Sequence, residues 1–388
     1  MNSNPRSLPL RRTAVALLFL FVLCITACGS GKFFVPVCQE TNTCSGGGGG
    51  GGTIPSSLAF VANASTGTLT TFPLAKTFTT VSGVTTNLGT PPSAIAGSPK
   101  GGLLYVATVG GSVFVYTVSA GGGLTLGNGG SPVTSTLLPT YMAIDPTGNW
   151  LFMVSSSSPQ LLVFQINPYT GALQQTNQGT IALSGGAPTQ IYVTPNGQAV
   201  YVGLGLGGMD TFAFNTSTGL LSNHLHLTTL LNGASADNSI AADNKSAYLF
   251  VGEAGSGIRV LAIGTAGTLK EISGSPFATQ LGPASIVVDS TNKYVYVANG
   301  GAGVITGYSL GSGGALTPLS SSPFNTGIKP VQMALDATGA YLLVINQGGN
   351  PDLQVFSFDT TTAGKLDPVT SSATGTDPAG AISLSVIP

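Results

Sequence analysis

The sequence predicts an all-β protein, a seven-bladed β-propeller closed by pairing of its C-terminal strand with its N-terminal blade. Three observations support this prediction. A motif recurs at spacings of 46 to 49 residues, and each full copy supplies four short strand-like segments. The first copy lacks the first of these segments, and the last copy consists of that segment alone. Of 388 residues, 42% are hydrophobic and 6% charged. That composition suits a large core and excludes charge-driven disorder and long surface helices.

The composition also limits the partners. Twelve Lys and Arg against 13 Asp and Glu give a formal net charge of −1. Because nothing in such a chain could neutralise a run of phosphates, we expect no nucleic-acid binding. The four cysteines and two histidines form no quartet with zinc-ligand spacing, so we expect no bound metal and no cofactor. We expect the protein to be a monomer.

Residues 1–27 are typical of an export signal. Three arginines within the first 12 residues form a positive segment, and residues 14–26 are uncharged and mostly apolar. This stretch is too short for a spanning helix, which needs about 20 residues. It ends in Ile-Thr-Ala-Cys at residues 25–28, which resembles a bacterial lipobox. The resemblance implies a mature protein that starts at a lipid-bearing Cys28 and is anchored to a membrane; an ordinary secretory signal is the alternative.

Residues 28–53 would link this anchor to the body of the protein. Gly29 follows the cysteine, where an Asp would indicate retention at the inner membrane, so we expect the outer membrane of a bacterial cell envelope. Cys38 and Cys44 are expected to form a local disulfide in that oxidising setting. The seven glycines at residues 46–52 predict a flexible tether.

Residues 54–388 carry the repeat. One unit reads PTYMAID from Pro139, turns, and continues as WLFMVS from Trp150. The strand-like segments are rich in Val, Ile, Tyr and Phe, are bounded by Gly, Asn and Asp, and lack a 3.6-residue period. The residues that precede the turn in successive copies are Ser98, Asp145, Thr194, Asp243, Asp289, Asp336 and Ser385. Four short strands in each repeat of this length are typical of a propeller blade.

The two ends of the repeat complete each other. The first unit has a second strand from Leu58 and a third strand from Thr68, but nothing that could be a first strand. The C-terminus ends in an isolated first strand, AGAISLS at residues 379–385. Pairing of the two ends would close a ring of seven blades and remove the exposed sheet edge at the seam.

Specific motifs in this body resemble those of a known family. They include YVYVAN from Tyr294, the PxxIxxD opening from Pro283, and Ser-Pro-Phe or Ser-Pro-Val segments such as the one at Ser275. Together they resemble the lactonase-type seven-bladed propellers, which include bacterial 6-phosphogluconolactonase-like proteins and YVTN-repeat surface proteins. The resemblance covers residues 54–388. It implies the propeller fold and, as one possible activity, hydrolysis of a sugar lactone or related lactone.

In this fold the turns after the first strands lie on one face, where residues such as Asp145 are expected to cap the turn backbone. The resemblance implies that sites lie on the other face. The residues that end the second strands there are Asn63, Thr108, Ser155, Leu204, Glu253, Asn299 and Asn346. The three asparagines, Asn63, Asn299 and Asn346, either present amides around the channel mouth to a sugar or peptide, or form turns at the strand ends.

Glu253 is the only acid at its position in any blade. Asp210 from the preceding blade and Arg259 on the next strand are expected near it, and these three residues are the candidate catalytic set. Asp237 and Lys329, on blade connections, are candidate ligand-binding residues. An acid facing an Arg or Lys is the minimum needed to bind a lactone carboxylate or phosphate and to activate water. The alternative is a rim of solvated charges.

Residues 54–388 hold one arginine, Arg259, and two histidines. His224 and His226 alternate on an outer strand and so share one side of a sheet, where with no evident third ligand they are expected to be surface histidines. The enzymes of the family rely on a set of His, Arg and Glu side chains, and this shortage argues against efficient hydrolysis. We therefore expect a lipid-anchored binding or scaffold propeller for a carbohydrate or envelope protein. The alternative is a lactonase that takes a small-molecule lactone, with Glu253 as base.

Overall fold

The computed structural model divides the chain into two compact units, Met1–Gly51 and Gly52–Pro388. The residues that it describes are 57–74, 83–134, 137–228, 237–255, 257–347, 353–372 and 380–388. The predicted signal segment, the lipid-bearing Cys28, the Cys38–Cys44 pair and the glycine tether lie outside them. Among the described residues, no helix is both long enough and apolar enough to cross a membrane.

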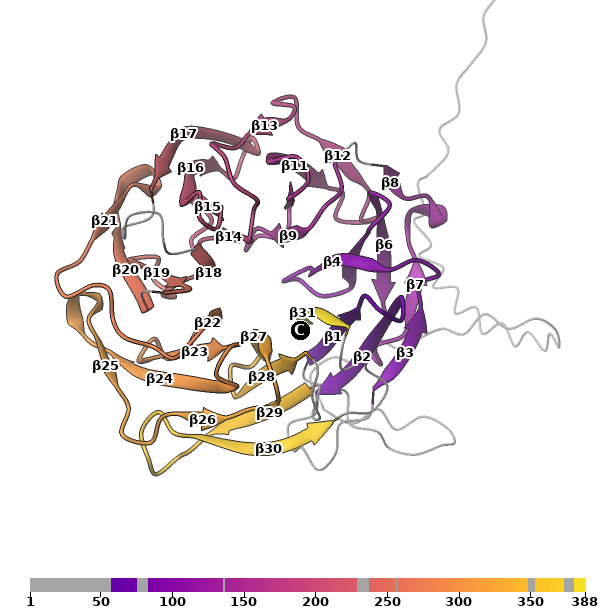
Figure 1. Cartoon of the computed structure of the whole chain (residues 1–388). Helices are drawn as coiled ribbons and strands as arrows, with labels where there is room; N and C mark the ends of the chain where they lie inside the picture. The colour runs from indigo at the N-terminus through magenta and orange to yellow at the C-terminus, as the bar shows by residue number, and fades with distance from the viewer. Residues whose placement is uncertain are drawn as a thin grey trace, which may run out of the picture. The chain divides into compact units, whose positions relative to one another are not determined.

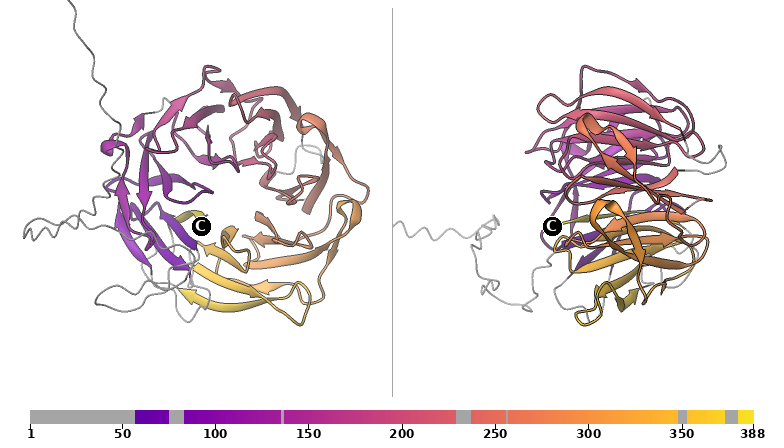
Figure 2. Two further views of the ribbon diagram at one scale, coloured as in Figure 1. Left: turned by 180° about the vertical axis from the view of Figure 1, so that it is seen from behind. Right: turned by 90° about the vertical axis from the view of Figure 1, so that its left-hand side faces the viewer.

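The unit Gly52–Pro388 is a ring of seven antiparallel sheets around a central channel (Figures 1 and 2). The innermost strands are β31 (Ala381–Ile387), β4 (Pro92–Gly97), β9 (Tyr141–Ile144), β14 (Gln190–Val193), β18 (Asp237–Ala242), β22 (Pro283–Val288) and β27 (Pro330–Leu335), which belong to blades 1 to 7 in that order. The second strands are β1 (Ser57–Asn63), β5 (Leu103–Thr108), β10 (Trp150–Ser155), β15 (Ala199–Gly203), β19 (Tyr248–Glu253), β23 (Tyr294–Asn299) and β28 (Tyr341–Asn346).

Two further strands complete each blade. The third strands are β2 (Thr68–Leu74), β6 (Ser112–Val118), β11 (Gln160–Ile166), β16 (Met209–Asn215), β20 (Gly257–Ile263), β24 (Val304–Leu310) and β29 (Leu353–Phe358). The outer strands are β3 (Val84–Asn87), β7 (Leu124–Leu126), β12 (Leu173–Gln175), β17 (Leu220–Leu227), β21 (Leu269–Glu271), β25 (Leu316–Pro318) and β30 (Leu366–Ser372). Short strands β8 (Val133–Thr134), β13 (Ile181–Ala182) and β26 (Phe324–Asn325) pair with the third strands of blades 2, 3 and 6. Single 3-10 turns lie at η1 (Asn128–Gly130), η2 (Thr265–Gly267) and η3 (Ser312–Gly314).

The predicted closure of the ring is confirmed. Strand β31 pairs antiparallel with β1, with Ser385 opposite Phe60 and Ile387 opposite Leu58. The C-terminal strand thus becomes the innermost strand of blade 1, which the N-terminal repeat lacks. Both ends of the described propeller, Ser57 and Pro388, lie on the same face as the turn that contains Gly101, where an added Cβ would lie 3.0 Å from the Pro388 carbonyl oxygen.

Strands in the middle of each blade are buried on both sides. Between blades 3 and 4, for example, Phe152 packs with Val200 and Phe212 in one apolar cluster. Since each sheet packs against a neighbour on either face, its central strands are nearly continuous apolar runs instead of alternating apolar and polar residues. This packing explains why the described strands of this unit contain so few charged residues.

In four blades, an aspartate at the same position caps the turn that follows the first strand. In blade 6, Asp289 Oδ1 accepts the backbone N–H of Lys293 at 2.7 Å and of Tyr294 at 2.6 Å, and Oδ2 accepts the N–H of Thr291 at 3.0 Å. Equivalent bonds are made by Asp145, Asp243 and Asp336. The predicted capping role is confirmed, and the face that carries these turns is called the capped face below.

Neighbouring blades are also joined by buried hydrogen bonds from tyrosine hydroxyls to glycine carbonyls. The three pairs are Tyr105 with Gly171 at 2.9 Å, Tyr201 with Gly267 at 3.2 Å, and Tyr296 with Gly364 at 2.9 Å. Burial raises the pKa of these phenols well above the ordinary value, so they remain donors. Gly364 has φ +72, and a Cβ there would lie 2.7 Å from Tyr294, so only glycine lets the next blade approach this closely.

We expect Tyr296→Phe to lower the free energy of unfolding by about 1–3 kcal/mol, because the buried Gly364 carbonyl loses its donor. Urea denaturation of the full chain measures this. The matched control is Tyr169→Phe, which removes a hydroxyl from a side chain that is 93% exposed and should change stability by less than about 0.5 kcal/mol. Equal stability of the two variants would contradict the role given to the blade-to-blade bond.

Candidate functional site

The central channel is a hollow in the described part of the propeller. Its volume is about 780 Å³, and it is lined by residues of the seven innermost strands. The described lining residues carry apolar groups, hydroxyls and amides, and none carries a carboxylate, an imidazole, an amine or a guanidinium. Burial raises the pKa of Tyr192 in this wall to about 12, so that phenol is not a base near neutral pH.

Glu253 and Arg259 come together as the sequence predicts. Glu253 ends β19, and Arg259 lies on β20 directly opposite Val251, which places both side chains on the side of the sheet that faces blade 4. Arg259 Nη1 is 3.1 Å from Glu253 Oε1, and its Nη2 is 3.7 Å from Glu271 Oε2. The exposed fraction is 0% for Glu253 and 1% for Arg259. The pair is therefore shielded from solvent between blade 5 and blade 4.

Burial of this ion pair limits its chemistry. Neither oxygen of Glu253 makes a hydrogen bond within the described structure, and Arg259 Nε also lacks one. Two charges that leave water together are stabilised mainly by each other, and loss of one partner leaves an unpaired buried charge. The backbone of Asp237 pairs with that of Glu253 across β18 and β19, but its side chain lies outside what the structure describes. In this conformation Glu253 has no contact with solvent from which to activate water.

Asp210 lies in a separate cluster. On β16 it shares a side with Phe212, which packs toward blade 3, so it points away from the Glu253–Arg259 pair. Asp210 Oδ1 is 2.9 Å from Nδ1 of His226, and Oδ2 is 3.0 Å from Nε2 of His224. The backbone N–H of Ser184 donates to Oδ2 at 2.7 Å. The candidate catalytic trio from the sequence is thus divided between two sides of blade 4.

The two histidines share one side of the sheet and are about one third exposed, at 36% for His224 and 34% for His226. No sequence pattern indicates that they face a buried carboxylate, because this contact depends on the strand register. His226 lies directly opposite Asp210, and a bulge near Asn223, where φ is +49, brings His224 to the same carboxylate. The described residues contain no group of three His, Cys, Asp or Glu that could hold a metal ion.

The pKa of Asp210 is set by opposing effects. Burial is the largest and disfavours the charged form, while hydrogen bonds from Ser184, His226 and His224 favour it. The hydrogen bonds together outweigh burial, so the pKa of Asp210 lies below its ordinary value.

This direction fixes the sign of a pH dependence. Because the pKa is lower in the folded chain than the unfolded value of about 3.9, the stabilisation by ionised Asp210 is complete above that value. It is lost as pH falls through the folded pKa. We expect Asp210→Asn to lower the free energy of unfolding by about 1.5–3 kcal/mol near pH 7, and this gap to narrow below about pH 4.

Urea denaturation between pH 3 and pH 7 measures the gap. The control is Asp367→Asn, which removes one partner of an exposed ion pair with Lys365 and should cost less than about 1 kcal/mol at every pH. A gap between wild type and Asp210→Asn that is constant over this range would contradict the prediction.

The three strand-end asparagines are fully buried. Asn63 Nδ2 donates to the hydroxyls of Thr68 and Thr70, both at 3.2 Å. Asn299 Nδ2 donates to the Thr306 hydroxyl at 3.0 Å and to carbonyls of its own hairpin. The amides of Asn63 and Asn299 point into the blades and hold the second strand to the third. Asn346 is buried at the corresponding position at the end of β28. Their ligand-binding role stays a prediction, and in this conformation they are not offered to solvent.

Lys329 is the sequence-predicted residue that does lie at the channel. It is exposed on the connection to β27, and its Nζ donates to Gln347 Oε1 at 2.6 Å. Gln347 belongs to the channel wall. The face that carries the blade-to-blade connections and the turns after the second strands is called the mouth face below.

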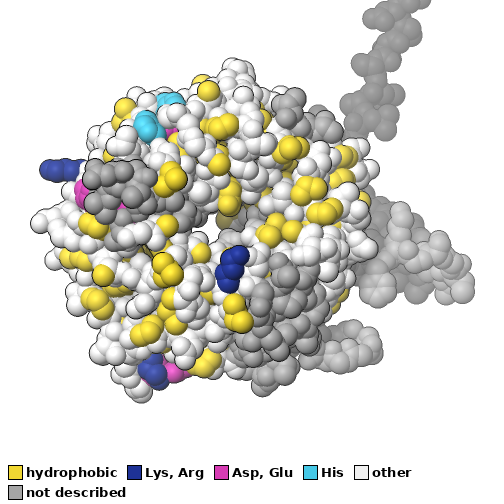
Figure 3. Space-filling model, viewed as in Figure 1, with side chains coloured by type: hydrophobic (Ala, Val, Ile, Leu, Met, Phe, Trp, Pro, Cys, Tyr) yellow, Lys and Arg dark blue, Asp and Glu magenta, His cyan; other side chains and the backbone are white. Residues whose placement is uncertain are grey.

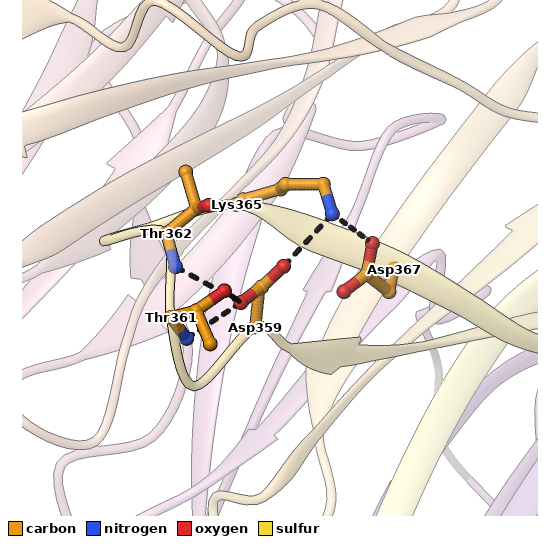
Figure 4. Close-up of polar contacts among 5 residues, drawn as sticks. All are labelled: Asp359, Thr361, Thr362, Lys365 and Asp367. Carbon is orange, nitrogen blue, oxygen red and sulfur yellow. Dashed lines mark hydrogen bonds and ion pairs between the residues drawn. The ribbon is translucent and has the colours of Figure 1, made fainter.

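A third group of charges lies on the outer hairpin of blade 7, far from the channel wall in the strand order (Figure 4). Lys365 Nζ is 2.8 Å from Asp359 and 2.6 Å from Asp367. Asp359 also accepts the N–H of Thr361 and of Thr362. The bond from Lys365 lowers the pKa of Asp359 and raises that of Lys365 to about 12. These contacts cap an exposed hairpin turn, and nothing about them suggests a ligand.

A family model described as "Lactonase, 7-bladed beta-propeller" matches residues 56–189 and 184–382. No curated protein matches the sequence. A Bacteroides fragilis protein, named as a candidate 6-phosphogluconolactonase, has a similar structure with a TM-score of 0.68 and 17% identity, over 87% of this chain and 99% of that one. The periplasmic gluconolactonase of Pseudomonas aeruginosa gives a TM-score of 0.68 and 16% identity over 86% and 99%. A Lactobacillus plantarum protein gives 0.67 and 19% over 86% and 99%. At such identities the likeness shows the fold alone.

Proposed function

The chain belongs to the lactonase family of seven-bladed β-propellers, and we propose that within this fold it binds an uncharged ligand in its channel without hydrolysing a lactone. One observation carries the proposal: no described residue of the channel wall has a carboxylate, imidazole, amine or guanidinium. General acid–base catalysis needs a group that changes protonation near the working pH within reach of the substrate. The two candidate acids, Glu253 and Asp210, are both fully buried in the blades.

The character of the wall also supports an uncharged ligand. A charge that enters the channel leaves water and finds hydroxyls, amides and apolar groups but no opposite charge among the described lining residues. A neutral carbohydrate or an uncharged peptide could instead exchange its hydrogen bonds with water for bonds to groups such as Gln347 and Ser383. Lys329 at the mouth is already hydrogen-bonded to Gln347.

The proposal includes a bacterial cell envelope location, with lipid attached at Cys28 and residues 28–53 as the link to the propeller. The described part of the propeller begins at Ser57 on the capped face, which is opposite the mouth face.

Lactone hydrolysis is the second candidate, because two similar structures are named for 6-phosphogluconolactonase or gluconolactonase activity. In that case Glu253 would serve as base, with Arg259 to bind the anion. Such a role requires blade 5 to open, since the two side chains are 0% and 1% exposed. An exported address also disfavours a phosphorylated cytosolic sugar as the substrate.

We expect the full chain to hydrolyse neither glucono-δ-lactone nor 6-phosphogluconolactone faster than the spontaneous reaction. A pH-stat assay at neutral pH measures the rate. Turnover above that background would overturn the proposal, and its loss in Glu253→Gln, with a thermal unfolding transition retained, would support the second candidate. The control Asp367→Asn should leave any turnover unchanged, because this residue is part of the exposed hairpin cluster.

We expect Ser383→Asp to weaken binding of an uncharged ligand at least about tenfold, because it places a carboxylate in the channel wall. The probe is an array of neutral oligosaccharides and uncharged peptides, with the strongest binders then titrated by calorimetry. Ser217→Asp, on an exposed turn of the capped face, is the matched control and should bind as wild type does. A ligand set that is mainly charged, or equal binding by both variants, would contradict channel binding.

A further inference from the structure

Exposed large apolar side chains gather on the mouth face. Six of the eleven such residues in the described structure lie on its turns, on its blade connections, or at the start of an innermost strand. They are Val109, Leu138, Tyr141, Leu206, Leu281 and Ile328, and this set is called the apolar collar. Their exposed fractions run from 39% for Tyr141 to 68% for Leu281. They come from blades 2, 3, 4, 6 and 7, so they surround the channel instead of forming one side of it.

Charged residues, in contrast, lie mainly on the turns of the capped face. On the described turns and connections of the mouth face, Lys329 is the only charged residue. The turns of the capped face carry nine: Lys100, Asp145, Asp243, Lys245, Asp289, Lys293, Asp336, Asp359 and Lys365. Figure 3 shows the mouth face, with the channel opening among apolar patches, one basic side chain beside it, and the other charged side chains toward the rim.

We propose that the apolar collar is a docking surface for a protein that presents an uncharged, apolar surface or segment over the channel mouth. The inference rests on the proposed binding function and names its partner class. Exposed apolar patches of this kind mark interaction sites, and the centres of protein interfaces are depleted of charge. A partner with several charges would lose their hydration here, and among the described turns and connections of this face it would find one charge, that of Lys329.

The composition of the collar distinguishes a protein from other partners. Membrane-binding faces combine apolar tips with several Lys or Arg for the headgroups and with aromatic rings at the interface. The described turns and connections of this face carry one basic residue, Lys329, and the collar contains one aromatic ring, that of Tyr141. A carbohydrate offers too little apolar surface to cover five aliphatic side chains. The described chain ends, Ser57 and Pro388, are on the capped face and leave the collar clear.

The test uses the full chain with Cys28→Ser, so that no lipid can attach, and a displayed library of random dodecapeptides as the probe. We expect the selected peptides to be uncharged and rich in apolar residues. In fluorescence polarisation, Leu281→Ser combined with Ile328→Ser should weaken their binding at least about tenfold. Val84→Ser combined with Tyr169→Ser is the matched control, because it removes equally exposed apolar side chains away from the mouth face and should change nothing.

Four results would overturn the inference. The first is a selected set dominated by charged peptides, and the second is equal binding by the collar and control variants. The third is sedimentation of the protein with phosphatidylcholine vesicles that is lost in the collar variant. The fourth is a concentration-dependent dimer of the protein that is lost in the collar variant.

Ser383→Asp separates the proposed binding in the channel from the proposed docking on the apolar collar. If this channel variant loses peptide binding and the collar variant keeps it, the docking surface is wrong and channel binding stands. If both keep it, both are wrong. Thermal unfolding of each variant verifies that it is folded.

Discussion

Contact between successive blades is the interaction on which the rest of the structure depends. Tyr296 donates a buried hydrogen bond to the Gly364 carbonyl of the next blade, and the same bond recurs at Tyr105 and Tyr201. A four-stranded sheet of this size cannot bury both of its apolar faces alone, so each blade is stable only between two neighbours. Pairing of β31 with β1 supplies the last neighbour and removes the remaining edge.

The shortage of charge follows from this packing. Sheets that are covered on both faces leave room for charged side chains only at turns and strand ends, or in pairs. Every acidic side chain that the structure describes caps a turn, bonds to histidines, or lies in an ion pair. The Glu253–Arg259 pair shows this constraint most clearly. Its two charges lie at the contact between blades, away from water, and are stabilised mainly by each other.

The fold could be predicted from the sequence because it repeats a local signal seven times, and strand-rich runs between Asp- and Gly-containing turns are visible without knowledge of contacts. The site could be predicted only in part. Glu253 and Arg259 were placed together correctly, but Asp210 belongs to another cluster, because one step along a strand reverses the side of the sheet. Its histidine partners depend on a bulge near Asn223 that has no recognisable sequence signal. The burial of Asn299 depends on Thr279 and Thr306, which come from different segments.

The two faces of the ring follow from the same division of residues. Turns on the capped face connect first strands to second strands, and in four blades an aspartate satisfies their backbone N–H groups, so charge collects there. The blade-to-blade connections on the mouth face are rich in glycine, serine, threonine and proline. Aliphatic side chains such as Leu281 and Ile328 are exposed on them. The described residues of the mouth face combine apolar side chains with a single charge on the turns and connections, an arrangement that excludes water from a contact and offers little means of acid–base catalysis. Within this family fold, that asymmetry is the physical basis of the proposed binding in the channel.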